Sequence, residues 1–335
     1  MAVLYVASED EGAGKTTLCV TLARLIADQG RRAVVFKPLA GEGREQDSDP
    51  DVAIYGKLLG QTTEGWPVAA SNRRLDAGLL GRIETVFADV SAGADAVIIE
   101  GSSALSRERT RRLVEALDAR VLVVVRYRHD LSADGLTGWK QQMGERLAGV
   151  LINGCTLHMG HEARTGLLPA LESEGLTPFG LVPEDRRLLG VSVRQLADHL
   201  GGRFIVCEEK ADALVEHLMV GGMGMDPGEY YFRERENKAV IGRGDRPDIH
   251  MSALATPTAC MVLTKGIEPI EYVKYEAEQE EVSVMVVETD TLETMDAVGS
   301  LVDRARFDHP LKLERYGELL EEHADLPGLL GLLGI

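Results

Sequence analysis

The stretch AVLYVASEDEGAGKTTLCVTLARLI, residues 2–26, predicts a strand, a loop and a helix in that order. Residues 2–7 form a short apolar run bounded by polar residues, which is typical of a buried strand. From Lys15 onward apolar side chains recur at helical spacing, and Gly30 supplies a stop signal. The side chains that share this helical face are Leu18, Leu22, Leu25 and Ile26.

The loop between strand and helix ends in Gly-Ala-Gly-Lys-Thr-Thr, which is typical of a phosphate-binding loop. Glycines let backbone N–H groups turn inward, and the start of the helix adds partial positive charge. The lysine can meet terminal phosphates, and the hydroxyl of the first threonine can coordinate Mg²⁺. The motif therefore predicts nucleotide binding by Gly12, Gly14, Lys15, Thr16 and Thr17. The alternative is a glycine-rich turn beside an ordinary solvated lysine.

The beginning of this loop departs from the usual pattern. Glu9 stands six residues before the lysine, where glycine is expected, and Asp10 and Glu11 follow. A longer variant of the loop would place the first glycine position at Ser8. A further variant, in which a partner's lysine completes the site, is excluded because Asp10 or Glu11 stands where that lysine would be. We expect the three carboxylates, called the acidic lip below, to face Mg²⁺, a cationic substrate group or a partner subunit.

The charge balance excludes several classes of partner. The formal net charge is −18, from 54 acidic and 36 basic residues, and such an excess repels nucleic acid and anionic membrane surfaces. No signal-peptide pattern is visible at the start, so we expect none, and no run approaches the ~18 apolar residues of a spanning helix. Four scattered cysteines fit a reducing compartment. We therefore expect a cytoplasmic protein that binds neither nucleic acid nor membrane.

Short Val-, Ile- and Leu-rich runs continue along the first part of the chain, with helical patterns between most of them. This alternation is typical of a parallel sheet that is covered by helices on both faces. The runs lie at 33–36, 95–100, 120–127, 149–153 and 178–183. The helical patterns lie around 75–90, 107–117, 134–146 and 191–200.

A Met- and Gly-rich patch at 219–232 interrupts the pattern, and strand–helix alternation then restarts and runs to about residue 305. This favours two domains, over 1–210 and 220–325, with a boundary between 205 and 225. The apolar tail at 326–335 is expected to dock on the chain's own surface, with a subunit contact as the alternative.

Six segments in order resemble the dethiobiotin-synthetase-like P-loop domains, in particular those at the front of long bacterial phosphotransacetylases and in free-standing relatives. The likeness covers about residues 1–205 and implies a P-loop NTPase-type α/β fold, a parallel sheet with helices on both faces. The segments are VASEDEGAGKTT, VVFKPLAG, SDPDVA, DAVIIEGSSAL, GVLIN and GLVPEDRRLLGVSVRQLADHL.

The second domain resembles the DRTGG domain, a smaller α/β domain, through YFRERENKAVIGRGDRPDI, LTKGIEP and ETDTLETMDAV. The name-giving residues read Asp-Arg-Pro-Asp-Ile at 245–249, which keeps only the Asp-Arg start. Arg243, Asp245 and Arg246 could receive an anion or form a tight turn. No acetyltransferase domain follows within the 335 residues, so we expect a relative of the phosphotransacetylases without that domain.

Lys37 ends the second strand, at the carboxyl edge where ligands of such sheets bind. The resemblance implies that it lies by the substrate carbamate and the transferred phosphate, which makes Lys15 and Lys37 the candidate catalytic residues. The alternative is a surface lysine at a strand end. The resemblance also implies that Asn153 contacts the nucleotide base.

The candidate Mg²⁺ ligands are Thr16, Asp51 and Glu100. Asp51 matches the family's metal-binding aspartate, with Asp49 a close rival and Asp47 a distant one; the alternative is a solvated acidic loop. Glu100 ends a strand next to the phosphate loop, where Mg²⁺ needs an oxygen ligand. Its alternative is a plain strand terminus.

The resemblance implies an ATP- and Mg²⁺-dependent ligase or ATPase that activates a carboxylate or carbamate by phosphoryl transfer. The competing hypothesis is a nucleotide- or metabolite-sensing regulatory module without turnover. A third is a scaffold whose phosphate loop has decayed. The expected partners are a nucleotide, a small molecule and a second copy of the chain, since the family often forms dimers.

Overall fold

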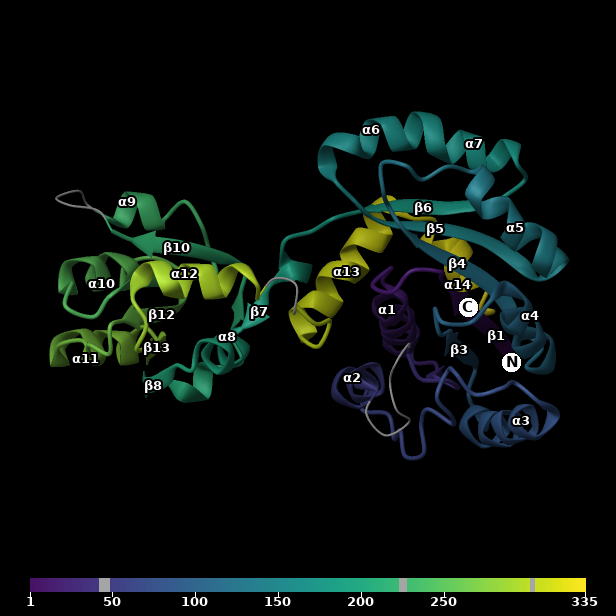
Figure 1. Ribbon diagram of the computed structural model, residues 1–335, viewed down its shortest axis with the longest axis horizontal. Coiled ribbons are helices and arrows are strands. Elements are labelled where there is room, and N and C mark those ends of the chain that lie inside the picture. Colours follow the sequence, from purple (N-terminus) through teal and green to yellow (C-terminus); the bar gives the residue numbers. More distant parts are fainter. Residues whose placement is uncertain (42–48, 223–227, 302–304) are drawn as a thin grey trace. The chain divides into compact units, whose positions relative to one another are not determined.

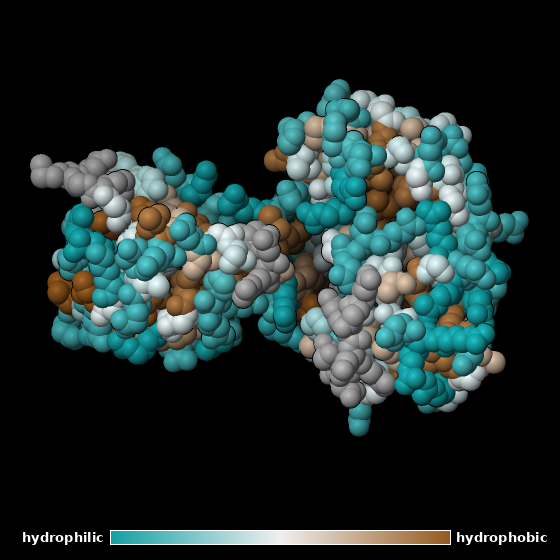
Figure 2. All heavy atoms as spheres, in the orientation of Figure 1, coloured by the Kyte–Doolittle hydropathy of each residue, from teal (hydrophilic) through white to brown (hydrophobic). Residues whose placement is uncertain are grey.

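The computed structural model describes residues 1–41, 49–222, 228–301 and 305–335, which fall into two compact units (Figure 1). The first unit contains Met1–Asp185 and Phe307–Ile335, and the second contains Arg186–Arg306. Figure 2 shows hydrophilic side chains over most of the visible face of each unit. Among the helices described, none is long and apolar enough to cross a membrane.

The first unit is built on a six-stranded sheet in the order β2-β3-β1-β4-β5-β6, and all neighbouring strands are parallel. This confirms the predicted fold class. Buried Val, Ile and Leu side chains explain the apolar runs, since both faces of the sheet are covered. The strands are β1 (Ala2–Ala7), β2 (Ala33–Phe36), β3 (Ala96–Glu100), β4 (Arg120–Arg126), β5 (Leu147–Cys155) and β6 (Pro178–Pro183).

Helices cover both faces of this sheet, and Figure 1 shows α6 and α7 on the side of β5 and β6 opposite to α13. They include α1 (Lys15–Asp28), α2 (Pro50–Leu59), α3 (Ala77–Ser91), α4 (Arg107–Ala116) and α5 (Asp134–Met143). Further along the chain are α6 (Gly160–Glu162), α7 (Leu168–Ser173), α13 (Pro310–His323) and α14 (Leu326–Gly331).

The C-terminal tail packs on the first unit, as expected. Leu329 and Leu333 are buried, and the backbone N–H of Asp325 donates to the carbonyl of Phe179 in β6 at 2.7 Å. Arg31 donates to the carbonyl of Gly334 at 2.9 Å. The tail is therefore held by both apolar packing and backbone hydrogen bonds.

The second unit contains a five-stranded sheet in the order β10-β11-β12-β13-β8, in which only β8 is antiparallel to its neighbour. Helices α8 (Val193–Leu200), α9 (Gly228–Phe232), α10 (Pro247–Leu254), α11 (Glu271–Gln279) and α12 (Thr291–Gly299) accompany it. The strands are β8 (Arg203–Val206), β10 (His217–Gly221), β11 (Lys238–Arg243), β12 (Thr258–Thr264) and β13 (Ser283–Val286).

The division between the units differs from the predicted boundary between 205 and 225. It lies at Asp185/Arg186, because β8 pairs with β13 and carries the chain before residue 210 into the second sheet. Residues from Phe307 onward return to the first unit rather than ending the second. The sequence gives no long-range pairing signal for so short a strand, which explains the error.

Lys238, the first residue of β11, is fully buried, and its Nζ donates to the carbonyl of Pro257 at 2.7 Å. Burial lowers the pKa of Lys238 from 10.5 to about 8, although Glu236 opposes the shift. Between these values the folded chain has released a proton that the unfolded chain still holds, so this lysine makes stability rise with pH.

The unfolding free energy of the wild type, minus that of Lys238→Met, is therefore expected to increase from about pH 8 to pH 10.5. Its slope should reach at most ~1.4 kcal/mol per pH unit. Urea unfolding at several pH values measures this difference. A difference that stays flat over this range would show that Lys238 keeps an ordinary pKa.

Candidate functional site

The carboxyl ends of β2, β3 and β1 lie side by side, because these strands are neighbours in a parallel sheet. Lys37 follows β2, Glu100 ends β3, and the phosphate loop follows β1. The hydroxyl of Thr16 donates to Glu100 Oε1 at 2.9 Å, and Lys37 Nζ lies 3.2 Å from the same oxygen. Four of the sequence-predicted site residues are thus close to one another: Lys15, Thr16, Lys37 and Glu100.

The phosphate loop requires glycine at two positions. Gly12 has φ 68° and Gly14 has φ 93°, in the region that favours glycine. Gly14 is also the N-cap of α1, and its carbonyl accepts from the backbone N–H of Leu18 at 3.0 Å. The loop therefore enters the helix in the conformation that exposes the first-turn N–H groups.

Asn153, at the end of β5, contacts the loop backbone directly. Its Nδ2 donates to the carbonyl of Ala13 at 3.0 Å. A Cβ added at Gly14 would lie 2.0 Å from this Nδ2, so the asparagine also limits the residue that can occupy position 14. The structure places Asn153 against the loop, and contact with a base stays a prediction.

Gly14→Ala is expected to destabilise the chain by ~2–5 kcal/mol, from a positive φ (~1–2 kcal/mol) and a clash with Asn153 (~1–3 kcal/mol). Gly30→Ala is the matched control, since Gly30 has φ 73° with nothing within 4 Å of an added Cβ. It should cost only the conformational part. Denaturant unfolding of both variants, and of Gly14→Ala combined with Asn153→Ala, measures the two parts. Equal losses in the two single variants would rule out the clash.

Ser8 forms hydrogen bonds at the beginning of the loop. It stands at the first glycine position of the longer loop variant. Its hydroxyl donates to the carbonyl of Asp10 at 2.8 Å and accepts from the backbone N–H of Asp10 at 3.0 Å. Lys15, which is buried, donates to the same carbonyl at 3.4 Å. Local side-chain bonds of this kind stabilise tight turns. A serine therefore gives the loop a defined shape without the missing glycine.

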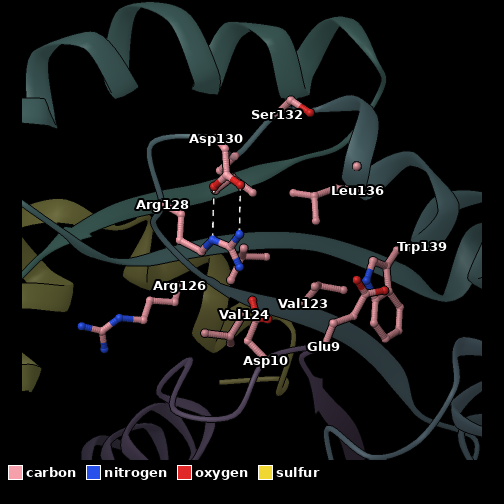
Figure 3. A pocket seen from close by; sticks show the side chains of 13 residues that line it. Glu9, Asp10, Val123, Val124, Arg126, Arg128, Asp130, Ser132, Leu136 and Trp139 are labelled. Carbon is pink, nitrogen blue, oxygen red and sulfur yellow. Dashed lines mark hydrogen bonds and ion pairs between the residues drawn. The ribbon is translucent and has the colours of Figure 1, made fainter. Parts of the chain in front are cut away.

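One member of the acidic lip, Glu9, pairs with a cation of the same chain. Glu9 forms an ion pair with Arg107 at 2.5 Å, and the Arg107 guanidinium lies 5.6 Å from the centre of the Trp139 ring. Glu9 and Asp10 line a cavity of about 190 Å³. Figure 3 shows the ion pair of Arg128 and Asp130 across this cavity from them. The charge of Glu9 is thus compensated within the chain.

Lys37 lies among three carboxylates. Its Nζ is 3.2 Å from Asp49 Oδ1, 3.2 Å from Glu100 Oε1, and in contact with Asp51. The side chains of Lys37, Asp49 and Glu100 are at most 2% exposed, and that of Asp51 is 23% exposed. Burial favours the neutral form of Lys37, but the carboxylates outweigh burial and raise its pKa. Burial also raises the pKa of Glu100, which Lys37 opposes.

Asp49 and Asp51 belong to the beginning of α2, which the sequence patterns did not identify. The Asp49 side chain caps the helix by accepting from the backbone N–H of Asp51 at 3.0 Å, and it also accepts from the N–H of Gly41 at 2.7 Å. The cap and Pro50 at the first helical position are the signals that could have predicted this helix. Asp47 lies outside the described residues.

Tyr55 is a member of the site that the sequence did not indicate. It is fully buried in α2, and its hydroxyl donates to Glu100 Oε2, the oxygen that neither Thr16 nor Lys37 contacts. Tyr55 lies one helical turn after Asp51, so both side chains are on one face of α2. That spacing is the signal that could have revealed it.

The described residues contain no group of three or more His, Cys, Asp or Glu side chains arranged to hold a metal ion by themselves. Mg²⁺ in nucleotide sites usually takes only one or two protein oxygens, with water and phosphate oxygens completing its octahedron. Thr16 and Glu100, joined by a hydrogen bond at the carboxyl edge, fit that smaller donor set. Asp51, which contacts Lys37, is a further oxygen donor close by.

Comparisons with known proteins give the following likenesses. A family model described as "AAA domain" matches residues 2–188, and one described as "DRTGG domain" matches residues 195–301. The phosphate acetyltransferase of Deinococcus radiodurans is 22% identical over 97% of this chain and 50% of its own length. That of Synechocystis is 21% identical over 75% of this chain and 39% of its own length. The aligned region is therefore at most half of each curated relative.

Solved structures show more distant likenesses. The MinD cell division protein of Aquifex aeolicus is 16% identical, with a TM-score of 0.39 over 56% of this chain and 85% of its own. Cobyrinic acid a,c-diamide synthase of Mycobacterium smegmatis, solved with ADP and magnesium, is 19% identical. Its TM-score is 0.36 over 56% of this chain and 88% of its own.

Proposed function

The chain belongs to the AAA domain family over residues 2–188, with a DRTGG domain over residues 195–301, and from this we propose that it binds Mg-ATP at the carboxyl edge of β1, β2 and β3. We further propose that it transfers the terminal phosphoryl group to a carboxylate or carbamate.

One observation carries the proposal: a phosphate loop, two buried lysines and a hydroxyl–carboxylate pair converge at a single sheet edge. Lys15 and Lys37 are 8% and 2% exposed, and Thr16 is hydrogen-bonded to Glu100. Phosphoryl transfer needs this combination, because it depends on positioning and on neutralising charge rather than on covalent chemistry by the protein. The backbone N–H groups of residues 12–17 would hold the phosphates.

In the reaction, an oxygen of the acceptor carboxylate attacks the terminal phosphorus, the bond to the bridging oxygen breaks, and ADP leaves with that oxygen's electron pair. The products are an acyl phosphate and ADP, and no proton has to move. Bound Mg²⁺ would neutralise charge on the phosphate oxygens. Lys15 neutralises charge on the transferred group, and Thr16 and Glu100 would hold the metal. Lys37 pairs with Asp49 and Asp51, and its ammonium lies 3.2 Å from Glu100 Oε1, the oxygen that Thr16 also contacts.

A second candidate function is nucleotide sensing without turnover. The observation that favours it is the pairing of Lys37 with three carboxylates. A cation compensated in this way is less able to stabilise the charge that develops on a transferred phosphoryl group. In this case the phosphate loop would bind ATP, and the bound nucleotide would act as a signal.

Release of ADP and binding of Mg-ATP, measured side by side, separate the two. Wild type and Lys15→Ala are incubated with Mg-ATP, with and without simple carboxylates and with amines in bicarbonate. ADP release that is stimulated by an acceptor and lost in Lys15→Ala supports phosphoryl transfer. Binding without release in any mixture supports sensing, and absence of binding contradicts both.

A further inference from the structure

The β10 edge of the second unit carries a cavity of about 450 Å³ with a concentration of basic side chains. Arg186, His217 and Arg235 line it, together with Tyr231 and Glu234. They come from three segments: the turn before β7 (Val191–Ser192), strand β10, and α9 with the residues just after it. A cluster of three basic groups is notable in a chain whose net charge is −18.

In the part of the chain that the structure describes, neither Arg186 nor Arg235 forms an ion pair with a carboxylate, although Glu234 also lines the cavity. Arg235 donates only to the carbonyl of Glu234, at 3.4 Å. The pKa of His217 is lowered mainly by burial, and further by the positive charges of Arg186 and Arg235. The three side chains are therefore close enough to interact electrostatically.

The arginines in and next to the name-giving segment of the DRTGG-like domain do have carboxylate partners. Arg243 forms an ion pair with Asp245, and Arg246 forms one with Asp248 at 2.7 Å. Their charges are therefore neutralised locally, and the structure favours the tight-turn interpretation of this segment over an anion site. Among the residues that the structure describes, Arg186 and Arg235, which have no ion pair, lie at the β10 edge instead.

A second cavity, of about 210 Å³, adjoins the first and shares Arg186, His217 and Leu218 with it. Its other walls are largely apolar and include Leu189, Val191, Val298 and Leu301. Glu216 also lines it, but this carboxylate accepts from Arg187 and Asn237 at 2.8 and 3.0 Å. A cavity lined by basic side chains therefore adjoins a cavity with largely apolar walls.

We propose that the second unit binds a nucleoside phosphate at these two cavities, with the phosphate groups on Arg186, His217 and Arg235 and the base in the apolar cavity. Arginine suits phosphate because its planar guanidinium donates two parallel hydrogen bonds. An apolar pocket with a few polar groups at its mouth suits a base, and cavities of ~300–1,000 Å³ hold small-molecule ligands. Glu234 can accept hydrogen bonds from ribose hydroxyls. This site is separate from the phosphate loop.

The test is a calorimetric titration of the full chain carrying Lys15→Ala, which weakens binding at the phosphate loop, with ADP as the probe. ADP should still bind this chain, and adding either Arg186→Ala or Arg235→Ala should weaken binding ~10–100-fold, the loss expected for one charge-assisted hydrogen bond. Arg233→Ala is the matched control. It is an exposed arginine close to Arg235 that pairs with Glu229 and does not line the cavity. It should leave ADP affinity unchanged.

Two more probes identify what is recognised. Leu189→Glu, a change at a side chain that is 37% exposed, should weaken ADP but leave pyrophosphate unaffected. Adenosine alone should bind more weakly than ADP. Failure of ADP to bind the Lys15→Ala chain, or equal affinity with and without the two arginines, would overturn the proposal. Pyrophosphate binding as tight as ADP, with no effect of Leu189→Glu, would overturn the nucleoside assignment. Each variant's thermal unfolding shows that it is folded.

Discussion

Lys37→Met is expected to destabilise the first unit by ~3–5 kcal/mol, the usual cost of leaving buried charges without their partner. The Lys37 side chain is 2% exposed and lies between the buried carboxylates of Asp49 and Glu100, with Asp51 at the rim. Methionine preserves most of the side-chain volume but not the charge. The loss therefore reports on electrostatics rather than on packing, and urea unfolding at pH 7 measures it.

The pH dependence of this loss follows from the same geometry. Without the ammonium, the pKa of Glu100 should rise further, since burial raises it and Lys37 is the main opposing influence. A folded-state pKa above the unfolded value makes stability fall as pH rises. Lys37→Met should therefore approach wild-type stability on acidification, and adding Glu100→Gln should restore part of the loss at pH 7.

Lys57→Met, at an exposed lysine paired with Asp308, should change stability by less than ~1 kcal/mol. A Lys37→Met chain as stable as this control would contradict the prediction.

Lys15→Ala is expected to weaken Mg-ATP binding at the phosphate loop by ~10–100-fold, because a hydrogen bond to a charged group contributes ~1.5–3 kcal/mol. Lys15 is bonded only weakly by the loop, through the 3.4 Å contact to the Asp10 carbonyl, so its ammonium can turn to a phosphate at little cost. Unlike Lys37, it is not the shared partner of three carboxylates. Its removal should affect binding much more than stability.

Calorimetry with Mg-ATP measures this effect, with Lys57→Ala as the control. Because the second unit is proposed to bind nucleotides as well, the titration is performed on chains that already carry Arg186→Ala and Arg235→Ala. An affinity within threefold of the parent chain would show that Lys15 does not contact phosphate.

The sequence was sufficient to predict the six-stranded parallel sheet, because strands that are buried on both faces are apolar along their whole length. It was insufficient for β8 and β10 of the second unit. The side chains of Arg203–Val206 are exposed or only partly buried, and His217–Gly221 includes partly buried His217, Leu218 and Val220, so neither run is continuously buried. Both are edge strands, with a neighbour on one side only.

The site was predictable to the extent that it depends on the ends of strands. Lys37, Glu100 and the phosphate loop could be grouped because parallel strands end at one edge. Asp49 and Asp51 could not be distinguished by spacing, and both contact Lys37. Tyr55 was missed because its role depends on how α2 packs against β3, a tertiary contact that no local pattern records.

A crystal structure of the chain with Mg²⁺ and a non-hydrolysable ATP analogue tests the central claim most directly. The account predicts triphosphate oxygens within hydrogen-bonding distance of the backbone N–H groups of residues 12–17, Lys15 Nζ on the terminal phosphate, and Mg²⁺ on Thr16. An empty phosphate loop at saturating analogue, or triphosphate bound only elsewhere in the chain, would contradict it.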